Sequence, residues 1–305
     1  WLKVYKIPEG SRTAKGKAVV NLIQLQPDEK IKAIIPTTDF DESKSLAFFT
    51  KNGIVKRTNL SEFKNIRSVG VRAISLDEND ELVTALIAQT YDDMPVTDPE
   101  NELSVETEVL EVEELQNEID EDNVNAEEDA NSGDEIMLFV VTKKGMCLKF
   151  KISKVRQMGR TARGVTGIKF KEPGDEVVGA AVIESNDQEI LSISQKGIGK
   201  RTTADEYRLT NRGGKGVICM KLTSRTGDLV GVVMVDEEQD LMALTSSGKM
   251  IRVDMQSIRK AGRNTSGVIV VNVDGDDVVS IARCPKADDG EDEDEAPSED
   301  MGLLE

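Results

Sequence analysis

The residues best suited to chemistry in this chain are arginines that recur at one position of a repeated loop. In four loops an arginine lies four residues before a glycine, and in a fifth it lies three residues before: Arg12, Arg160, Arg212, Arg263 and, in the fifth, Arg67. Three of these loops carry a second base directly before the glycine: Lys15, Arg163 and Lys215. A guanidinium group forms paired hydrogen bonds to a phosphate, and glycine lets the phosphate approach backbone N–H groups. The spacing therefore predicts a row of phosphate contacts.

Other chemistries have little support in the composition. The chain contains no histidine, which excludes a Ser-His-Asp or Cys-His site and removes the commonest metal ligand. Three cysteines, Cys147, Cys219 and Cys284, stand singly in apolar stretches without a C-x-x-C pair. We therefore expect buried thiols in a reducing compartment, no catalytic residue and no metal site. No signal peptide and no membrane-spanning run is visible, so a cytoplasmic protein without a membrane partner is predicted.

The arginine loops belong to a repeat of about fifty residues. Strand-like runs turn at a glycine and restart, as in AFFTKNGIVKR, LFVVTKKGMCLKF, LSISQKGIGKR and LMALTSSGKMIRV. The turn glycines are Gly53, Gly145, Gly197 and Gly248, and the later gaps are 52 and 51 residues. Each hairpin is followed by the arginine loop with its glycine, an acidic turn and a Val-rich run. Each unit thus reads as four short strands.

Four-strand units at this spacing predict an all-β, propeller-like ring in which each sheet packs on its neighbour. A pair of β-sandwiches is the alternative, although a sandwich does not require such regular spacing. We divide the chain into a partial blade at 1–45, blades at 46–91, 136–187, 188–238 and 239–285, an acidic insertion at 92–135 that is disordered or partly helical, and an acidic disordered tail at 286–305.

The net charge of −18 hides a basic body. Residues 92–135 carry 19 acidic side chains and no Lys or Arg, and residues 286–305 carry 10 acidic side chains and one lysine. Without these two segments the remainder has a charge of about +10. We hypothesise that the acidic segments compete with an anionic partner for the basic surface, which deleting them and measuring affinity at low salt would test.

A second set of bases lies on the return strand of each hairpin. Its members are Lys56, Arg57, Lys149, Lys151, Lys200, Arg201 and Arg252. Repeat geometry places equivalent loops on one rim, so both sets are expected to form a band that contacts the backbone of double-stranded DNA. Only 4% of the residues are aromatic, which disfavours base stacking on single strands or RNA. A protein-interaction propeller and a module that binds an acidic protein are the competing classes, and an enzyme is the weakest.

Several strings resemble the C-terminal domain of the DNA gyrase A subunit. The longest is KVYKIPEGSRTAKGKAVVNLIQLQPDEKI at 3–31, and others are NGIVKRTNLSEF, GVTGIKF, GIGKRTTADEY, KGVICMKL and AGRNTSGVIVV. The resemblance extends to about Pro285 and is interrupted by the acidic insertion. The C-terminal domain of the A-type subunit of topoisomerase IV is the alternative, with more degenerate repeats.

The resemblance implies a six-bladed β-pinwheel whose blades exchange strands and wrap DNA, with about five blades present here and the first of these partial. It implies no cofactor in this part, because ATP, Mg and the catalytic tyrosine belong to other parts of the ATP-dependent holoenzyme, which introduces negative supercoils. The implied partners are the breakage-reunion domain of gyrase A and gyrase B in an A2B2 assembly, associated with the nucleoid. The family's basic box, QRRGGKG, is expected before Trp1, and the nearest string, at 210–216, matches five of its seven positions.

Overall fold

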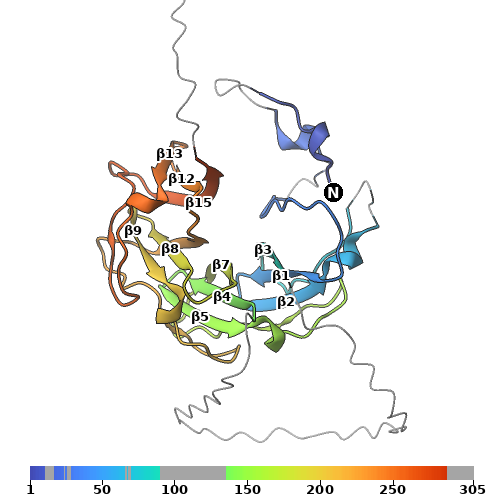
Figure 1. The fold of residues 1–305 in the computed structure, drawn as a ribbon, viewed down its shortest axis with the longest axis horizontal. Helices are drawn as coiled ribbons and strands as arrows, with labels where there is room; N and C mark the ends of the chain where they lie inside the picture. Colours follow the sequence, from blue (N-terminus) through green and yellow to red (C-terminus); the bar gives the residue numbers. More distant parts are fainter. Residues whose placement is uncertain are drawn as a thin grey trace, which may run out of the picture.

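The computed structural model is an arc of four small antiparallel sheets (Figure 1). It describes residues 1–10, 17–23, 25, 29–65, 67, 70–89 and 135–286. In each sheet one strand lies on the inner side of the arc, and the hairpin lies outside it (Figure 1). The predicted all-β, propeller-like architecture is therefore confirmed, with four sheets in the described part of the chain.

The first three sheets have the same strand order. From inside to outside, the first contains β3 (Leu82–Gln89), β1 (Lys44–Thr50), β2 (Ile54–Asn59) and β6 (Val165–Thr166). The second contains β7 (Val177–Ile183), β4 (Met137–Thr142), β5 (Met146–Lys151) and β10 (Val217–Ile218). The third contains β11 (Leu229–Met234), β8 (Glu189–Ser194), β9 (Ile198–Thr203) and β14 (Val268–Ile269). The fourth has three strands, β15 (Val278–Pro285), β12 (Gln239–Thr245) and β13 (Met250–Asp254).

The outermost strand of each four-stranded sheet comes from the following unit of the repeat. Ile54 of β2 pairs with Thr166, Cys147 of β5 pairs with Val217, and Ile198 of β9 pairs with Ile269. A contiguous four-strand unit, as read from the repeat alone, is therefore not one sheet. The exchange matches the one that the family resemblance implies, and it ties each blade to the next through backbone hydrogen bonds.

Acidic turns close the hairpins through hydrogen bonds to the backbone of the hairpin turn. The Asp80 carboxylate accepts a hydrogen bond of 2.9 Å from the backbone N–H of Asn52, and Asp175 accepts an equal one from Lys144. Lysines in these turns also pair with the acidic turn of the next unit, as in Lys144–Asp228 at 3.1 Å. These carboxylates therefore order their own hairpin and join neighbouring blades.

Apolar side chains fill the spaces between consecutive sheets. Phe49 of the first sheet packs with Leu138 and Phe150 of the second, all at most 2% exposed. The second and third sheets share a cluster that includes Phe139 and Tyr207, whose rings lie 4.8 Å apart between centroids. Because each sheet covers the face of its neighbour, the core is continuous along the arc.

The N-terminal segment does not form the predicted strands in its described residues. It contains two short 3₁₀ turns, η1 (Val4–Lys6) and η2 (Val19–Asn21), and the first strand begins at Lys44. Trp1 anchors the segment, because its ring packs edge-on against Phe40 and its Nε1 donates 2.9 Å to the carbonyl oxygen of Phe63. Val20 is 63% exposed. The segment therefore packs on the first blade without adding a sheet.

The two acidic segments fall almost wholly outside the described residues, which resume at Glu135 and end at Lys286. Within the described part of the chain, no helix is long and apolar enough to cross a membrane.

A candidate nucleic-acid interface on the outer loops

Three equivalent loops form the candidate interface, and we call them the arginine loops: residues 156–164, 208–216 and 259–267. Each follows a 3₁₀ turn that ends the return strand of a hairpin: η4 (Ile152–Lys154), η5 (Ala204–Glu206) and η6 (Met255–Ser257). Each leads into the exchanged outer strand of the preceding blade. The exchange thus fixes the loops at the outer edge of the arc.

Backbone hydrogen bonds link each loop to the one before it. The carbonyl oxygen two residues before the loop glycine accepts from an N–H of the preceding unit, at 3.2 Å for Ser75 to Ala162 and 2.9 Å for Lys169 to Gly214. Lys221 donates in the same way to Thr265, at 3.1 Å. The loops therefore form one hydrogen-bonded row along the rim, and their side chains recur at regular intervals.

The predicted loop arginines lie on this row and also hold it together. Arg212 is exposed, and its Nε and Nη1 donate to the carbonyl oxygens of Lys154 and Thr166 at 2.8 and 3.1 Å. Arg263 is half-buried, and its Nη1 donates 3.2 Å to the carbonyl oxygen of Ile218. A guanidinium group has five N–H donors. Both arginines therefore keep donors for a further acceptor.

The remaining loop bases have different surroundings. Arg67 and Lys215 are exposed and Arg160 is half-buried, whereas the exposed Arg163 forms an ion pair with Asp77. Arg12 and Lys15 lie outside the described residues. The described loop bases thus gather on the same rim, with one of them partly neutralised.

Four bases predicted to contact DNA from the return strands are buried instead. Lys56 and Lys200 are fully buried, and Arg57 and Lys149 are 4% exposed. Lys149 Nζ donates 2.6 Å to the carbonyl oxygen of Ala204, and burial lowers its pKa. Arg57 Nη1 lies 3.5 Å from the carbonyl oxygen of Ile152. The loops and turns of the next blade cover these side chains, so a phosphate at the surface cannot reach them.

The other three return-strand bases are paired with carboxylates. Lys151 lies 2.7 Å from Glu135, and Arg252 Nε donates 2.7 Å to Asp240. Arg201 lies 3.4 Å from Glu189 and donates from Nε to the carbonyl oxygen of Ile258 at 2.7 Å. Their charges are therefore partly neutralised, and they contribute less to an anion-binding surface than the loop bases do.

The structure adds three arginines that the spacing argument missed: Arg156, Arg208 and Arg259. All are exposed, and none of them forms an ion pair within the described part of the chain. Each lies eight residues before a loop glycine, as in VRQMGRTARG, YRLTNRGGKG and IRKAGRNTSG. The signal was therefore present as a second fixed offset.

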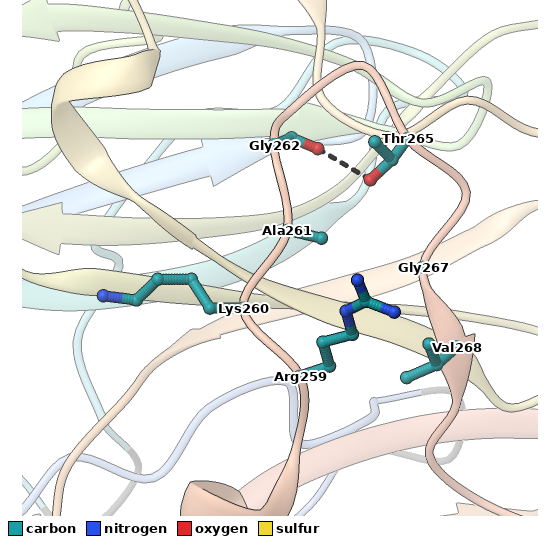
Figure 2. A pocket seen from close by; sticks show the side chains of 7 residues that line it. All are labelled: Arg259, Lys260, Ala261, Gly262, Thr265, Gly267 and Val268. Carbon is teal, nitrogen blue, oxygen red and sulfur yellow. Dashed lines mark hydrogen bonds between the residues drawn. The ribbon is translucent and has the colours of Figure 1, made fainter.

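The last arginine loop folds around a hollow of about 370 Å³ (Figure 2). The guanidinium group of Arg259 lies inside the bend of the loop and points toward Gly267 and Val268 (Figure 2). Thr265 Oγ1 donates 2.7 Å to the carbonyl oxygen of Gly262 and keeps the bend closed. Lys260, on the rim of the hollow, pairs with Glu189. This arrangement places a cation that has no ion-pair partner among the described residues beside glycine backbone, as contact with a phosphate requires. Among the described residues no group of His, Cys, Asp and Glu is arranged to hold a metal ion.

Comparison with known families identifies the repeat. A family model described as "DNA gyrase C-terminal domain, beta-propeller" matches residues 1–38, 44–89, 137–184, 188–236 and 239–285. The chain belongs to this family. The five matches begin and end close to the units read from the glycine spacing, and the first of them covers the N-terminal segment, whose described residues form no strand before Lys44.

Curated relatives are gyrase A proteins. The DNA gyrase A protein of Campylobacter fetus is 72% identical over 99% of this chain and 34% of its own length. The gyrase A protein of Helicobacter pylori (strain 26695) is 48% identical over 95% of this chain and 30% of its own length. The chain therefore spans about a third of the length of these relatives and matches the C-terminal part of gyrase A.

Solved structures share the architecture. A DNA gyrase A C-terminal domain has a TM-score of 0.66 at 22% identity and covers 88% of this chain and 75% of its own. The C-terminal domain of DNA topoisomerase IV has a TM-score of 0.67 at 23% identity and covers 88% of this chain and 71% of its own. At such identities the likeness shows the fold alone, and it does not separate the two proteins.

Proposed function

We propose that this gyrase C-terminal domain binds double-stranded DNA along its row of arginine loops, without reading base sequence. The observation that carries the proposal is the repetition of one geometry. Successive loops are joined by the same backbone hydrogen bond, and each presents an exposed arginine without an ion pair: Arg156, Arg208 and Arg259. A row of cations with one spacing complements the regular phosphates of a duplex.

The shape of the rim supports a curved path for the DNA. The exchanged strands lie at the outer edges of sheets that follow an arc, so the loops follow the same arc (Figure 1). A duplex that touches successive loops must bend, at an elastic cost on the order of 1–6 kcal/mol for 20–30 base pairs. Additional phosphate contacts offset this cost, so bending and binding are expected to occur together as wrapping.

Within a longer gyrase A protein, the wrapped duplex would be presented to the part of the enzyme that cuts and passes DNA. The relatives support this role by name, since they are gyrase A proteins. On this proposal the domain assists ATP-dependent negative supercoiling by a type IIA topoisomerase and holds no catalytic residue, while the breakage-reunion domain and gyrase B supply the chemistry, ATP and Mg.

Duplex binding is tested by fluorescence anisotropy with a labelled 40-base-pair duplex across a salt series. The unmodified chain should lose affinity steeply with salt, and a triple variant with Arg156, Arg208 and Arg259 each changed to Gln should lower the log–log slope by about 2–3, because each lost phosphate contact removes about 0.9. A matched triple variant, Lys143, Lys144 and Lys196 to Gln, removes the same charge from the hairpin turns and should change the slope by less than about 1.

Two outcomes would overturn the proposal. One is an affinity independent of salt, and the other is an equal loss of slope in both triple variants, since neither is compatible with contacts confined to the arginine loops. Wrapping has a separate test: a nicked plasmid is sealed in the presence of the chain and then freed of protein. A shift in linking number is expected, and an unchanged linking number would limit the function to binding.

A further inference from the structure

One position on the return strand alternates between lysine and an apolar residue from blade to blade. Three residues after the hairpin glycine, the successive blades carry Lys56, Leu148, Lys200 and Ile251. These four residues occupy equivalent positions in their hairpins. In each hairpin the residue two positions after the turn glycine pairs with the first strand, and the residue compared here comes directly after it. The lysines are therefore not part of a uniform basic stripe, and their role has to be sought in what each contacts.

Lys200 contacts the backbone of the arginine loop above it. Its fully buried Nζ donates to the carbonyl oxygens of Gly262 and Arg263, at 2.6 and 2.5 Å. The neighbouring Thr202 Oγ1 donates 2.8 Å to the carbonyl oxygen of Ala261. Two side chains of β9 thus donate hydrogen bonds to three consecutive carbonyl groups of the loop, the last of which belongs to the loop arginine Arg263.

Lys56 makes the equivalent contact in the first blade. Its fully buried Nζ donates to the carbonyl oxygens of Ala73 and Arg160, at 2.5 and 2.6 Å. The second acceptor again belongs to the loop arginine of the next blade. Ala73 lies in the preceding loop segment, so this single ammonium group joins two consecutive stretches of the rim.

The loop above Leu148 is built differently and serves as an internal comparison. Leu148 is buried, and no lysine supports the carbonyl groups of residues 211–214 from this position. The loop instead uses Gly213 at φ 80°, whose N–H donates 2.6 Å to the carbonyl oxygen of Gly167. The side chain of Leu148 ends near this loop, because a Cβ added at Gly214 would lie 3.5 Å from Leu148 Cδ1, and it offers the loop carbonyl groups no hydrogen-bond donor.

We propose that Lys56 and Lys200 are positioning residues, whose buried ammonium groups hold the arginine loops of the next blade in the conformation that binds phosphate. The proposal rests on the duplex-binding function proposed above. It assigns no DNA contact to either lysine. Each ammonium group donates charge-assisted hydrogen bonds, which are about twice as strong as neutral ones, and so joins the loop backbone to the return strand beneath it.

Burial brings the pKa of both lysines close to physiological pH. Burial lowers the pKa of Lys200 to about 8, while Cys219, Glu206 and Cys147 raise it and Arg263 lowers it further. These four groups, from the exchanged strand region, η5, β5 and the arginine loop, are the titratable or charged groups that act on it. An opened loop exposes the lysine to water, where its pKa is about 10.4, so the open state binds more protons than the closed state. Loop opening should therefore become rarer as the pH rises through this range.

The surroundings of Lys56 are simpler. Burial alone lowers its pKa to about 8, and the ring of Phe48 lies 5.6 Å from Nζ. The segments that supply its two acceptors carry Arg72, Arg160, Arg163 and Asp77, of which the last two pair with each other. The pH response of the first loop should therefore match that of the third.

The experiment uses the 305-residue chain and the variants Lys56→Leu and Lys200→Leu, each of which copies the residue found at Leu148. Lys149→Leu is the matched control, because it removes an equally buried ammonium group that supports a 3₁₀ turn instead of an arginine loop. Amide hydrogen exchange, corrected for the intrinsic rate of each amide, is measured without DNA at Ser75 and Lys221, which donate to the first and third loops, and at Lys169, which donates to the unsupported loop.

Exchange at Lys221 should rise about tenfold in Lys200→Leu and exchange at Ser75 should rise similarly in Lys56→Leu, whereas Lys169 should be unchanged in both, since loss of charged donors opens only the loops they support. Duplex affinity at pH 7 should fall about three- to tenfold in each variant, because a loosened loop no longer holds its arginine in place for a phosphate.

Three outcomes would overturn the proposal: unchanged exchange at Ser75 and Lys221, equal changes in the Lys149→Leu control, or a loosened loop with undiminished affinity. If instead the unmodified chain fails to bind duplex while the exchange pattern is as expected, the proposed function fails and the loop support stands. Should a leucine variant unfold, the pH dependence of the corrected exchange at Ser75 and Lys221 in the unmodified chain decides alone. Relative to Lys169, exchange at these two amides should fall about tenfold between pH 7 and 9, because opening exposes a lysine whose pKa is about 8 in the closed loop. The same pH dependence at all three amides would overturn the proposal.

Discussion

Alanine at Gly267 is expected to separate the last two sheets, whereas alanine at Gly275 is not. Both glycines have nearly the same positive φ, 84° and 88°. A Cβ at Gly267 would lie 2.3 Å from the carbonyl oxygen of Gly199, at the point where the exchanged strand β14 meets β9. A Cβ at Gly275 meets nothing within 4 Å. The two substitutions therefore share the conformational cost and differ only in the clash.

The magnitude follows from what the clash displaces. The left-handed conformation costs an L-residue about 1–2 kcal/mol, which both variants lose. The atom that clashes with a Cβ at Gly267 is a backbone oxygen of β9, which cannot rotate away. Strand β14 itself must therefore move, and its two paired positions with β9 open. Val271, which is 1% exposed at the end of this segment, would lose burial worth about 1.5–3 kcal/mol. Gly267→Ala should therefore cost about 2.5–5 kcal/mol, against about 1–2 kcal/mol for Gly275→Ala.

Urea unfolding followed by far-ultraviolet circular dichroism measures both variants under the same conditions. The expected result is a midpoint shift for Gly267→Ala at least twice that for Gly275→Ala, together with faster amide exchange at Val270 and Val271, which donate to the carbonyl oxygen of Gly197. Equal shifts for the two variants would show that the close approach of the exchanged strand contributes nothing to the free energy of unfolding, and the reasoning would be refuted.

Two further predictions concern buried groups. Because burial lowers the pKa of Lys56 to about 8 in the folded chain, against about 10.4 when unfolded, the unfolded state binds more protons between these values. The free energy of unfolding of the unmodified chain should therefore rise relative to Lys56→Met, by roughly 1.5 kcal/mol from pH 8 to 9.5; parallel pH profiles in urea titrations would contradict it. Burial also raises the pKa of the Cys147 thiol. A thiol reagent at pH 8 should label half-buried Cys284 first and reach Cys147 and Cys219 only on unfolding, as mass spectrometry of digests would show; early labelling of Cys147 would contradict the burial.

Glycine spacing was enough to predict the hairpins and their stacking. Gly53, Gly145 and Gly197 all adopt the positive φ that tight turns require, and the strands on either side pair as expected. Strand exchange could not be predicted from the residues alone. The exchanged strands are two residues long, as in Val165–Thr166, and so short a run has no periodicity that distinguishes its own sheet from its neighbour's.

The candidate site was likewise predictable only where local residue spacing was sufficient. The recurring offset located Arg160, Arg212 and Arg263 on equivalent loops of one rim, whereas Arg12 lies outside the described residues; a second offset would have located Arg259 and its equivalents. Lys56 and Lys200 were grouped with exposed bases because exposed lysine is the common case. These lysines are buried by a loop of the next blade, more than fifty residues later in the chain. No local sequence pattern could have indicated this burial.

Strand exchange also has a consequence for synthesis of the chain on the ribosome. The three strands of the first sheet are complete at Gln89, but the sheet's fourth strand begins only at Val165. In the same way β5 waits for Val217, and β9 waits for Val268. Each of these sheets therefore lacks its outer strand until the next unit of the repeat has been translated. During translation the four-stranded sheets are therefore completed in order from the N-terminal end, and a chain interrupted between two units leaves the last complete hairpin with an open edge.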